Sequence, residues 1–248
     1  MDPNALRRRI FAALTAPMLA AGPIAAGPLP AAADDIAAVV ELFTSQGCSS
    51  CPPADALLSE VAARPDVLAL SEHIDYWDHL GWKDPFSSAA ATERQRDYAR
   101  LFGLRFVYTP QMVINGDVQV TGSDRVKVLA ALTAARAPLP LDVNIVGDAA
   151  QGLRARVSGP GEAGATADVW LFALDPEHRT AVAAGENAGR SLRNTNIVRR
   201  LAHLGTWKGG ELALPIAMDG DARLQPCAVI VQDRTSGRIL GADRWPGA

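Results

Sequence analysis

The sequence has 248 residues, 48% of them hydrophobic, and a formal net charge of −3 at pH 7. This composition is typical of a soluble globular protein with one large domain or two modest ones. The weak negative charge and the lack of a basic run after the N-terminus argue against nucleic acid as a partner.

Residues 1–33 have the features of a secretory signal peptide. Three arginines at 7–9 precede an apolar, alanine-rich run over 10–29, and three alanines at 31–33 form the expected cleavage site. A membrane anchor is the alternative, but proline and glycine make the run a poor spanning helix. These residues are Pro17, Gly22, Pro23, Gly27, Pro28 and Pro30. We therefore expect a periplasmic or secreted protein with no stable membrane insertion after cleavage, exported by the Sec or the twin-arginine route.

A Cys-x-x-Cys pair lies between a strand-like and a helix-like segment. Residues 39–43 form a β-branched and aromatic run, the pattern breaks at 45–47, and a helical pattern covers 54–61. Unpaired N–H groups at a helix N-terminus favour a thiolate. We therefore expect Cys48 to be the exposed nucleophile, with a pKa below the free-thiol value of about 8.5, and Cys51 to be the resolving thiol.

The stretch around these cysteines resembles a family of bacterial secreted thioredoxin-like proteins of largely unknown function. The matching segments are residues 39–55, 75–78, 81–86, 108–112 and 185–190, so the resemblance covers nearly the whole mature chain. It implies a thioredoxin fold in which Pro110 is a cis-proline facing the cysteine pair. The backbone of Thr109 would then be free to pair with an extended substrate.

The remaining pattern predicts the fold class, an α/β thioredoxin-like domain followed by a smaller all-β, sandwich-like domain. Strands are expected at 36–43, 67–74, 106–114 and 118–121, and helices at 53–63, 88–102 and 123–136. Residues 34–137 would form the first domain, and 137–140 a linker. Short apolar runs at 141–146, 153–157, 168–174, 212–216 and 228–232 predict a β-rich domain over 138–248, with one helix at 196–204.

Glu41 is a carboxylate within the first apolar strand. A raised pKa would suit it to accept the proton of Cys51, whereas the alternative is that it points to solvent or pairs with an arginine.

Four further residues are candidates for substrate binding. Trp77 and Trp82 belong to the aromatic segment 75–86, which could line a groove beside the cysteines or pack onto the domain. Asn187 and Arg190 lie in a polar, glycine-rich stretch that could bridge the domains, touch a substrate near Cys48, or form a solvated loop.

Cys227 is the third cysteine of the mature chain and lies in an apolar run, so we expect a buried, inert thiol. His73 with Cys48 and Cys51 could hold Cu(I), or Zn(II) with Cys227 or His79 added. A single Cys-x-x-Cys is a weak metal signal, so we expect neither a metal nor a cofactor.

These observations predict an exported thiol-disulfide oxidoreductase that acts on protein or small-molecule thiols and disulfides. The alternatives are a metallochaperone that uses the same cysteines and a redox-silent binding module. The fold alone does not decide among them.

Overall fold

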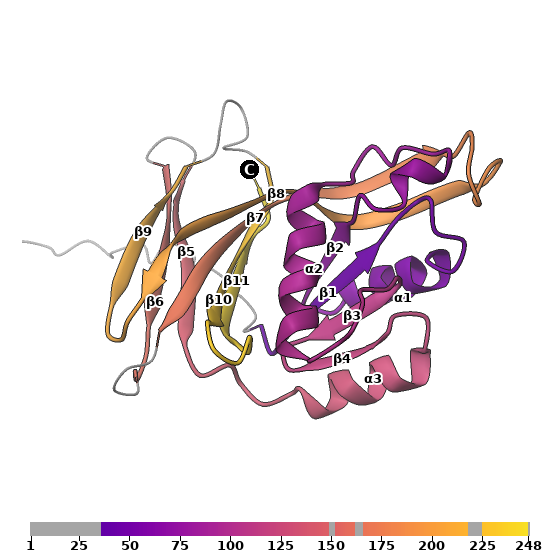
Figure 1. Ribbon diagram of the computed structural model, residues 1–248. Helices are drawn as coiled ribbons and strands as arrows, with labels where there is room; N and C mark the ends of the chain where they lie inside the picture. The colour runs from indigo at the N-terminus through magenta and orange to yellow at the C-terminus, as the bar shows by residue number, and fades with distance from the viewer. Residues whose placement is uncertain (1–35, 149–151, 162–165, 218–224, 248) are drawn as a thin grey trace, which may run out of the picture. The chain divides into compact units, whose positions relative to one another are not determined.

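The computed structural model describes residues 36–148, 152–161, 166–217 and 225–247. Residues 34–248 form one compact unit (Figure 1). The predicted signal peptide lies outside the described residues. Within the described part of the chain, no helix is long and apolar enough to cross a membrane.

Among the described residues, the first half contains both helices and strands, and strands alone follow. The helices are α1 (Pro52–Ala62), the short 3-10 helix η1 (Asp78–Leu80), α2 (Ala89–Leu101) and α3 (Arg125–Ala134). The strands of the first half are β1 (Ala38–Thr44), β2 (Val67–His73), β3 (Gln111–Ile114) and β4 (Val118–Thr121). Those of the second half are β5 (Asp142–Asp148), β6 (Gly152–Ser158), β7 (Ala167–Ala181), β8 (Ser191–Trp207), β9 (Leu212–Ile216), β10 (Cys227–Asp233) and β11 (Ile239–Trp245).

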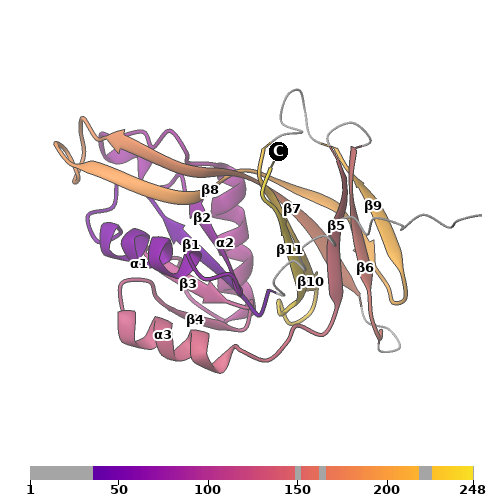
Figure 2. The ribbon, with the colours of Figure 1, turned by 180° about the vertical axis from the view of Figure 1, so that it is seen from behind.

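The first half is built around a βαβ unit. β1 and β2 are parallel and joined by α1, while β3 pairs antiparallel with both β1 and β4. Every residue of β1 is buried, because helices cover both faces of the sheet (Figures 1 and 2). Val40 and Leu42 pack against α1 and α3 on one face, whereas Phe43 packs against α2 on the other. Side chains alternate between faces along a strand, so β1 divides its residues between two cores.

The second half is rich in strands. β7 and β8 form a long antiparallel hairpin and continue the main sheet, whose order is β11-β10-β7-β8-β2-β1-β3-β4. β5, β6 and β9 form a second, three-stranded sheet. Both sheets contribute to one apolar core, which includes Val143, Val157, Val169, Trp207 and Val229. The predicted fold class is confirmed.

The two halves share one sheet. The change from α/β to β structure falls between α3 and β5, close to the expected linker at 137–140. However, β8 pairs in parallel with β2 at Ser71 and Ile197. The division into domains at residues 34–137 and 138–248 stays a prediction, and strands of both halves belong to one sheet.

The prediction of a helix at residues 196–204 is wrong. This segment belongs to β8, which pairs with β7 along nearly its whole length, with register shifts beside Trp170 and Leu174. Long-range pairing, which local pattern does not report, overrides helix propensity here. The β7–β8 hairpin therefore continues to the loop that carries the cysteine pair.

Candidate functional site

Cys48 and Cys51 form a disulfide at the start of α1, with their Cα atoms 5.5 Å apart. β1 ends at Thr44, and Cys51 directly precedes the helix, whose first residue is Pro52. Pro52 fits there because the first helical turn needs no N–H donor. Cys48 is 2% exposed and Cys51 is fully buried. The expectation that Cys48 is exposed is therefore wrong, because groups from other parts of the chain cover it.

One part of the cover is the cis-proline loop. The Thr109–Pro110 peptide bond is cis, as predicted. The Thr109 hydroxyl donates to Cys48 Sγ across 3.4 Å, and Trp77 Nε1 donates to Thr109 Oγ1 across 2.8 Å. Of the predicted site residues, Thr109 therefore contacts the sulfur directly, Trp77 contacts Thr109, and Pro110 follows Thr109 through the cis bond.

The other part of the cover is the tip of the β7–β8 hairpin, residues 182–190, which we call the hairpin tip. Asn187 is fully buried there and donates through Nδ2 to the backbone carbonyls of Gln46 and Cys48, each across 2.9 Å. Arg190 NH1 donates to Asn187 Oδ1 across 2.8 Å. The carboxylate of Glu186 accepts from the Ser49 backbone N–H across 3.0 Å. The structure therefore brings Asn187 and Arg190 to the cysteine loop.

Trp82 contacts the turn that precedes Cys48. Its Nε1 donates to Gln46 Oε1 across 3.3 Å. Gln46 Nε2 donates in turn to Thr180 Oγ1 and Asn194 Oδ1 on β7 and β8. Trp82 thus acts through the turn before Cys48 and ties that turn to the hairpin.

Asp55 is a buried acid in the first turn of α1 that the sequence analysis did not select. Asp55 is 5% exposed and accepts from the Thr44 hydroxyl across 2.9 Å. Burial raises the pKa of Asp55 to about 6, against the opposing effects of the His73 charge and the Thr44 hydrogen bond. Asp55 follows Cys51 by four residues, a spacing that places the two on one face of α1. That spacing was a usable signal in the sequence.

His73 and Asp84 extend this buried polar cluster. His73 Nδ1 lies 2.7 Å from Asp84 Oδ2, which also accepts from the Gln46 backbone N–H across 2.8 Å. Burial alone would raise the pKa of Asp84, but the charge and hydrogen bond of His73 and two backbone N–H groups hold it below its usual value. Among the described residues, no group of three or more His, Cys, Asp or Glu side chains is arranged to hold a metal.

Glu41 is not brought to the cysteines. It is fully buried on the α2 face of the sheet, where it accepts hydrogen bonds from Arg94 and Tyr98. The proton-shuttle role proposed for it fails on strand geometry, because α1 covers the face of Leu42 and not that of Glu41. The alternative, pairing with an arginine, is what the structure shows.

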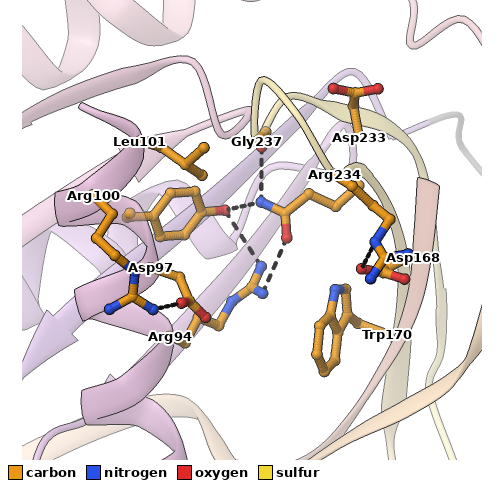
Figure 3. A pocket seen from close by; sticks show the side chains of 11 residues that line it. Arg94, Asp97, Arg100, Leu101, Asp168, Trp170, Asp233, Arg234 and Gly237 are labelled. Carbon is orange, nitrogen blue, oxygen red and sulfur yellow. Dashed lines mark hydrogen bonds and ion pairs between the residues drawn. The ribbon is translucent and has the colours of Figure 1, made fainter. Parts of the chain in front are cut away.

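Arg94 also borders a cavity of about 230 Å³ on this second face. Figure 3 shows the residues that line this cavity, which include Trp170 and two ion pairs, Arg100 with Asp97 and Arg234 with Asp168. This cavity lies on the side of the sheet opposite α1, so we assign it no part in the chemistry of the disulfide.

Cys227 is fully buried in β10, as expected. It packs in the core between the two sheets together with Val229 and Val231. Burial, with a smaller effect of the Asp243 charge, raises the pKa of the Cys227 thiol to about 12. It is therefore protonated at neutral pH and lies in a different core from the disulfide.

Comparisons with known proteins give a family but no activity. The family described as "Protein of unknown function (DUF1223)" matches residues 39–232. A bacterial protein from Agrobacterium tumefaciens, whose X-ray structure comes from a structural genomics programme, is similar at 33% identity with a TM-score of 0.73. That match covers 86% of this chain and 96% of the Agrobacterium chain. A comparison with curated proteins gave no match.

Proposed function

The chain belongs to the DUF1223 family, and from its site we propose that it exchanges thiols and disulfides through Cys48 and Cys51. The observation that carries the proposal is the disulfide at the start of α1, with the hydroxyl before a cis-proline donating to Cys48 Sγ. This arrangement provides a sulfur that can be attacked, a second sulfur that can leave, and a donor that stabilises a thiolate.

Exchange proceeds through a mixed disulfide. When substrate thiols reduce the protein disulfide, a substrate thiolate first attacks Cys48 Sγ. The Cys48–Cys51 bond breaks, and Cys51 leaves with the electron pair. A second substrate thiolate then attacks the substrate sulfur of the mixed disulfide and releases Cys48 as a thiolate. The sum is two thiols oxidised to one disulfide and one protein disulfide reduced to a dithiol. The oxidation of the dithiol by a substrate disulfide reverses these steps.

Asp55 is the proton acceptor that we assign to Cys51. When Cys51 is a thiol and must attack the mixed disulfide at Cys48, its proton needs a nearby base. Asp55 lies one helical turn away, and a carboxyl with a pKa of about 6 is suited to take up and release a proton near neutral pH. His73 adjusts this acid through its charge, and Asp84 holds the His73 ring in place.

We place this exchange outside the cytoplasm, in the periplasm or a secreted fraction. The N-terminal signal pattern supports export, and an oxidising compartment allows a dithiol pair to cycle. The partners would be protein or small-molecule thiols and disulfides. The cycle itself uses sulfur chemistry and requires no cofactor.

Turnover tests the proposal directly. We expect the wild type to accelerate the reduction of a fluorescent peptide disulfide by dithiothreitol, and Cys48→Ser to be inactive. Cys227→Ser should keep full activity, because Cys227 is buried in another core. An equal loss in Cys227→Ser, or full activity in Cys48→Ser, would contradict the assignment.

Asp55→Asn should be both more stable and slower. A carboxyl whose pKa is higher in the folded than in the unfolded state contributes stability that is lost as pH rises, here between about pH 4 and 6. The rise from 3.8 to about 6 corresponds to at most about 3 kcal/mol. We therefore expect Asp55→Asn to gain up to that amount over the wild type at pH 7.5, and little at pH 4, in denaturant unfolding of the oxidised protein.

Asp66→Asn is the matched control. Asp66 is a surface carboxyl whose pKa is lowered by a hydrogen bond from Arg64, so its removal should not stabilise the protein at pH 7.5. The exchange rate should fall in Asp55→Asn and stay unchanged in Asp66→Asn. A wild-type rate in Asp55→Asn would remove the proton-acceptor role.

A further inference from the structure

We propose that the cavity between α1 and the start of β8 binds the carboxylate of a small anionic thiol that reacts at Cys48. This inference rests on the proposed exchange function and names its substrate class. The cavity has a volume of about 300 Å³ and is lined by Pro52 and Ser59 of α1 and by Arg190 and Arg193. Such a volume is at the lower end of small-molecule sites. Pro52, one of the lining residues, directly follows Cys51 in the sequence.

The charge of this cavity favours a carboxylate. Arg190 and Arg193 supply two guanidinium groups, which bind carboxylates through paired hydrogen bonds. Asp55 is the acidic residue of the lining, but its carboxyl accepts from Thr44 and is 5% exposed. Glu177 pairs with Arg193, and both side chains are about half exposed, so a ligand carboxylate can replace this partner.

The structure links the cavity to Cys48 through two hydrogen bonds. Arg190 NH1 donates to Asn187 Oδ1, and Asn187 Nδ2 donates to the Cys48 carbonyl. A carboxylate bound to Arg190 competes with Asn187 for this guanidinium. The competition weakens the hold of the hairpin tip on the cysteine loop when the ligand arrives. Binding of an anion and exposure of Cys48 are thereby coupled.

The cover also limits the size of the substrate. Cys48 is 2% exposed in the oxidised protein. Asn187 of the hairpin tip binds its backbone carbonyl, and Trp77 donates to the Thr109 hydroxyl that contacts its sulfur. A small thiol held by Arg190 needs only a local opening of the cysteine loop to reach Cys48, whereas a folded protein surface must displace the hairpin tip first. The docked thiolate attacks Cys48 Sγ, Cys51 leaves as a thiolate, and a second small thiol completes the reduction as described above.

Three small thiols of different charge test this assignment on the oxidised full chain. They are mercaptoacetate (negative), 2-mercaptoethanol (neutral) and cysteamine (positive). Each rate of disulfide reduction is divided by the rate of the same thiol with an unstructured Cys-x-x-Cys peptide, which removes differences in intrinsic reactivity. We expect mercaptoacetate to exceed 2-mercaptoethanol by about tenfold or more, and cysteamine to be slowest.

The double variant Arg190→Gln/Arg193→Gln should abolish this preference, and Arg193→Gln alone should reduce it. The ratio of rates is the readout, because loosening Asn187 alters the individual rates. Arg125→Gln is the matched control, since Arg125 is an exposed arginine of α3 paired with Glu60 of α1. It should keep the wild-type ratio. Cys227 that stays unlabelled by iodoacetamide shows that each variant is folded.

A wild-type ratio in the double variant, or an equal loss in Arg125→Gln, would overturn the binding site while leaving exchange intact. If no thiol of any charge reduces the disulfide, the proposed function itself fails, and this inference fails with it. The two failures are therefore distinguished by the neutral thiol alone.

Discussion

Replacing Cys51 with serine should convert the protein into a trap that holds its substrates covalently. Cys48 is then a free thiol beside the Thr109 hydroxyl and can still attack a substrate disulfide. Without Cys51, no internal sulfur attacks the mixed disulfide, and the adduct persists. When Cys51→Ser is incubated with an extract of exported proteins or with a small disulfide, we expect covalent adducts on non-reducing gels. Dithiothreitol should release all of them.

Cys48→Ser is the matched control for the trap. Cys51 is fully buried, so it should form no adducts when left alone. The two variants differ only in which sulfur remains, and both lose the same disulfide. If Cys48→Ser forms adducts and Cys51→Ser does not, the roles of the two cysteines are the reverse of those assigned. If Cys51→Ser forms no adducts, the protein is not the proposed thiol-disulfide exchange enzyme.

Replacing Arg94 with alanine should lower the free energy of unfolding by about 3–5 kcal/mol. Arg94 is 5% exposed and forms ion pairs with Glu41 and, at 3.5 Å, with Glu72. Burial and the charge of Glu41 already raise the pKa of Glu72 well above its usual range, and Arg94 opposes this rise. Its removal leaves two acidic groups buried together with no counter-charge. The measurement is denaturant unfolding at pH 7.

Arg96→Ala is the control for this prediction. Arg96 lies on the same helix and pairs with Glu93, but both side chains are at least half exposed. Exposed pairs of this kind contribute about 0.3–0.5 kcal/mol. A loss below about 1 kcal/mol in Arg94→Ala would show that the buried cluster is not organised around this arginine.

Much of the first half of the fold follows from local pattern. The apolar run of β1, the break before Cys48 and the helical pattern of α1 identify a βαβ start without any long-range information. The cis-proline and the hairpin tip residues followed from resemblance to a family. The structure adds the physical reason for the latter, since Asn187 binds the carbonyl of Cys48 from 139 positions away.

The missed features depend on which face a residue occupies and on distant pairing. Glu41 and Leu42 are adjacent in sequence, yet they belong to opposite faces of one strand. The proton acceptor therefore comes from α1, as Asp55, and not from β1. The segment 196–204 has no local strand signal, because its partner strand β7 supplies the pairing.

The burial of Cys48 also could not be predicted from the local sequence pattern. A helix N-terminus predicts where a thiolate is stabilised, but not whether another part of the chain covers it. Asn187 on the hairpin tip and Trp77 near η1 provide that cover. Both arrive through long-range packing of segments far apart in the sequence.

Cys48 and Cys51 should cycle between dithiol and disulfide. The most direct test is to equilibrate the protein in a series of glutathione buffers of different potential and to label its free thiols. The mass of the peptide that contains both cysteines then gives the ratio of dithiol to disulfide. We predict one two-electron transition between about −120 and −300 mV, in which each 29.6 mV changes the ratio of forms tenfold. A pair that stays fully oxidised or fully reduced across that range would contradict the account.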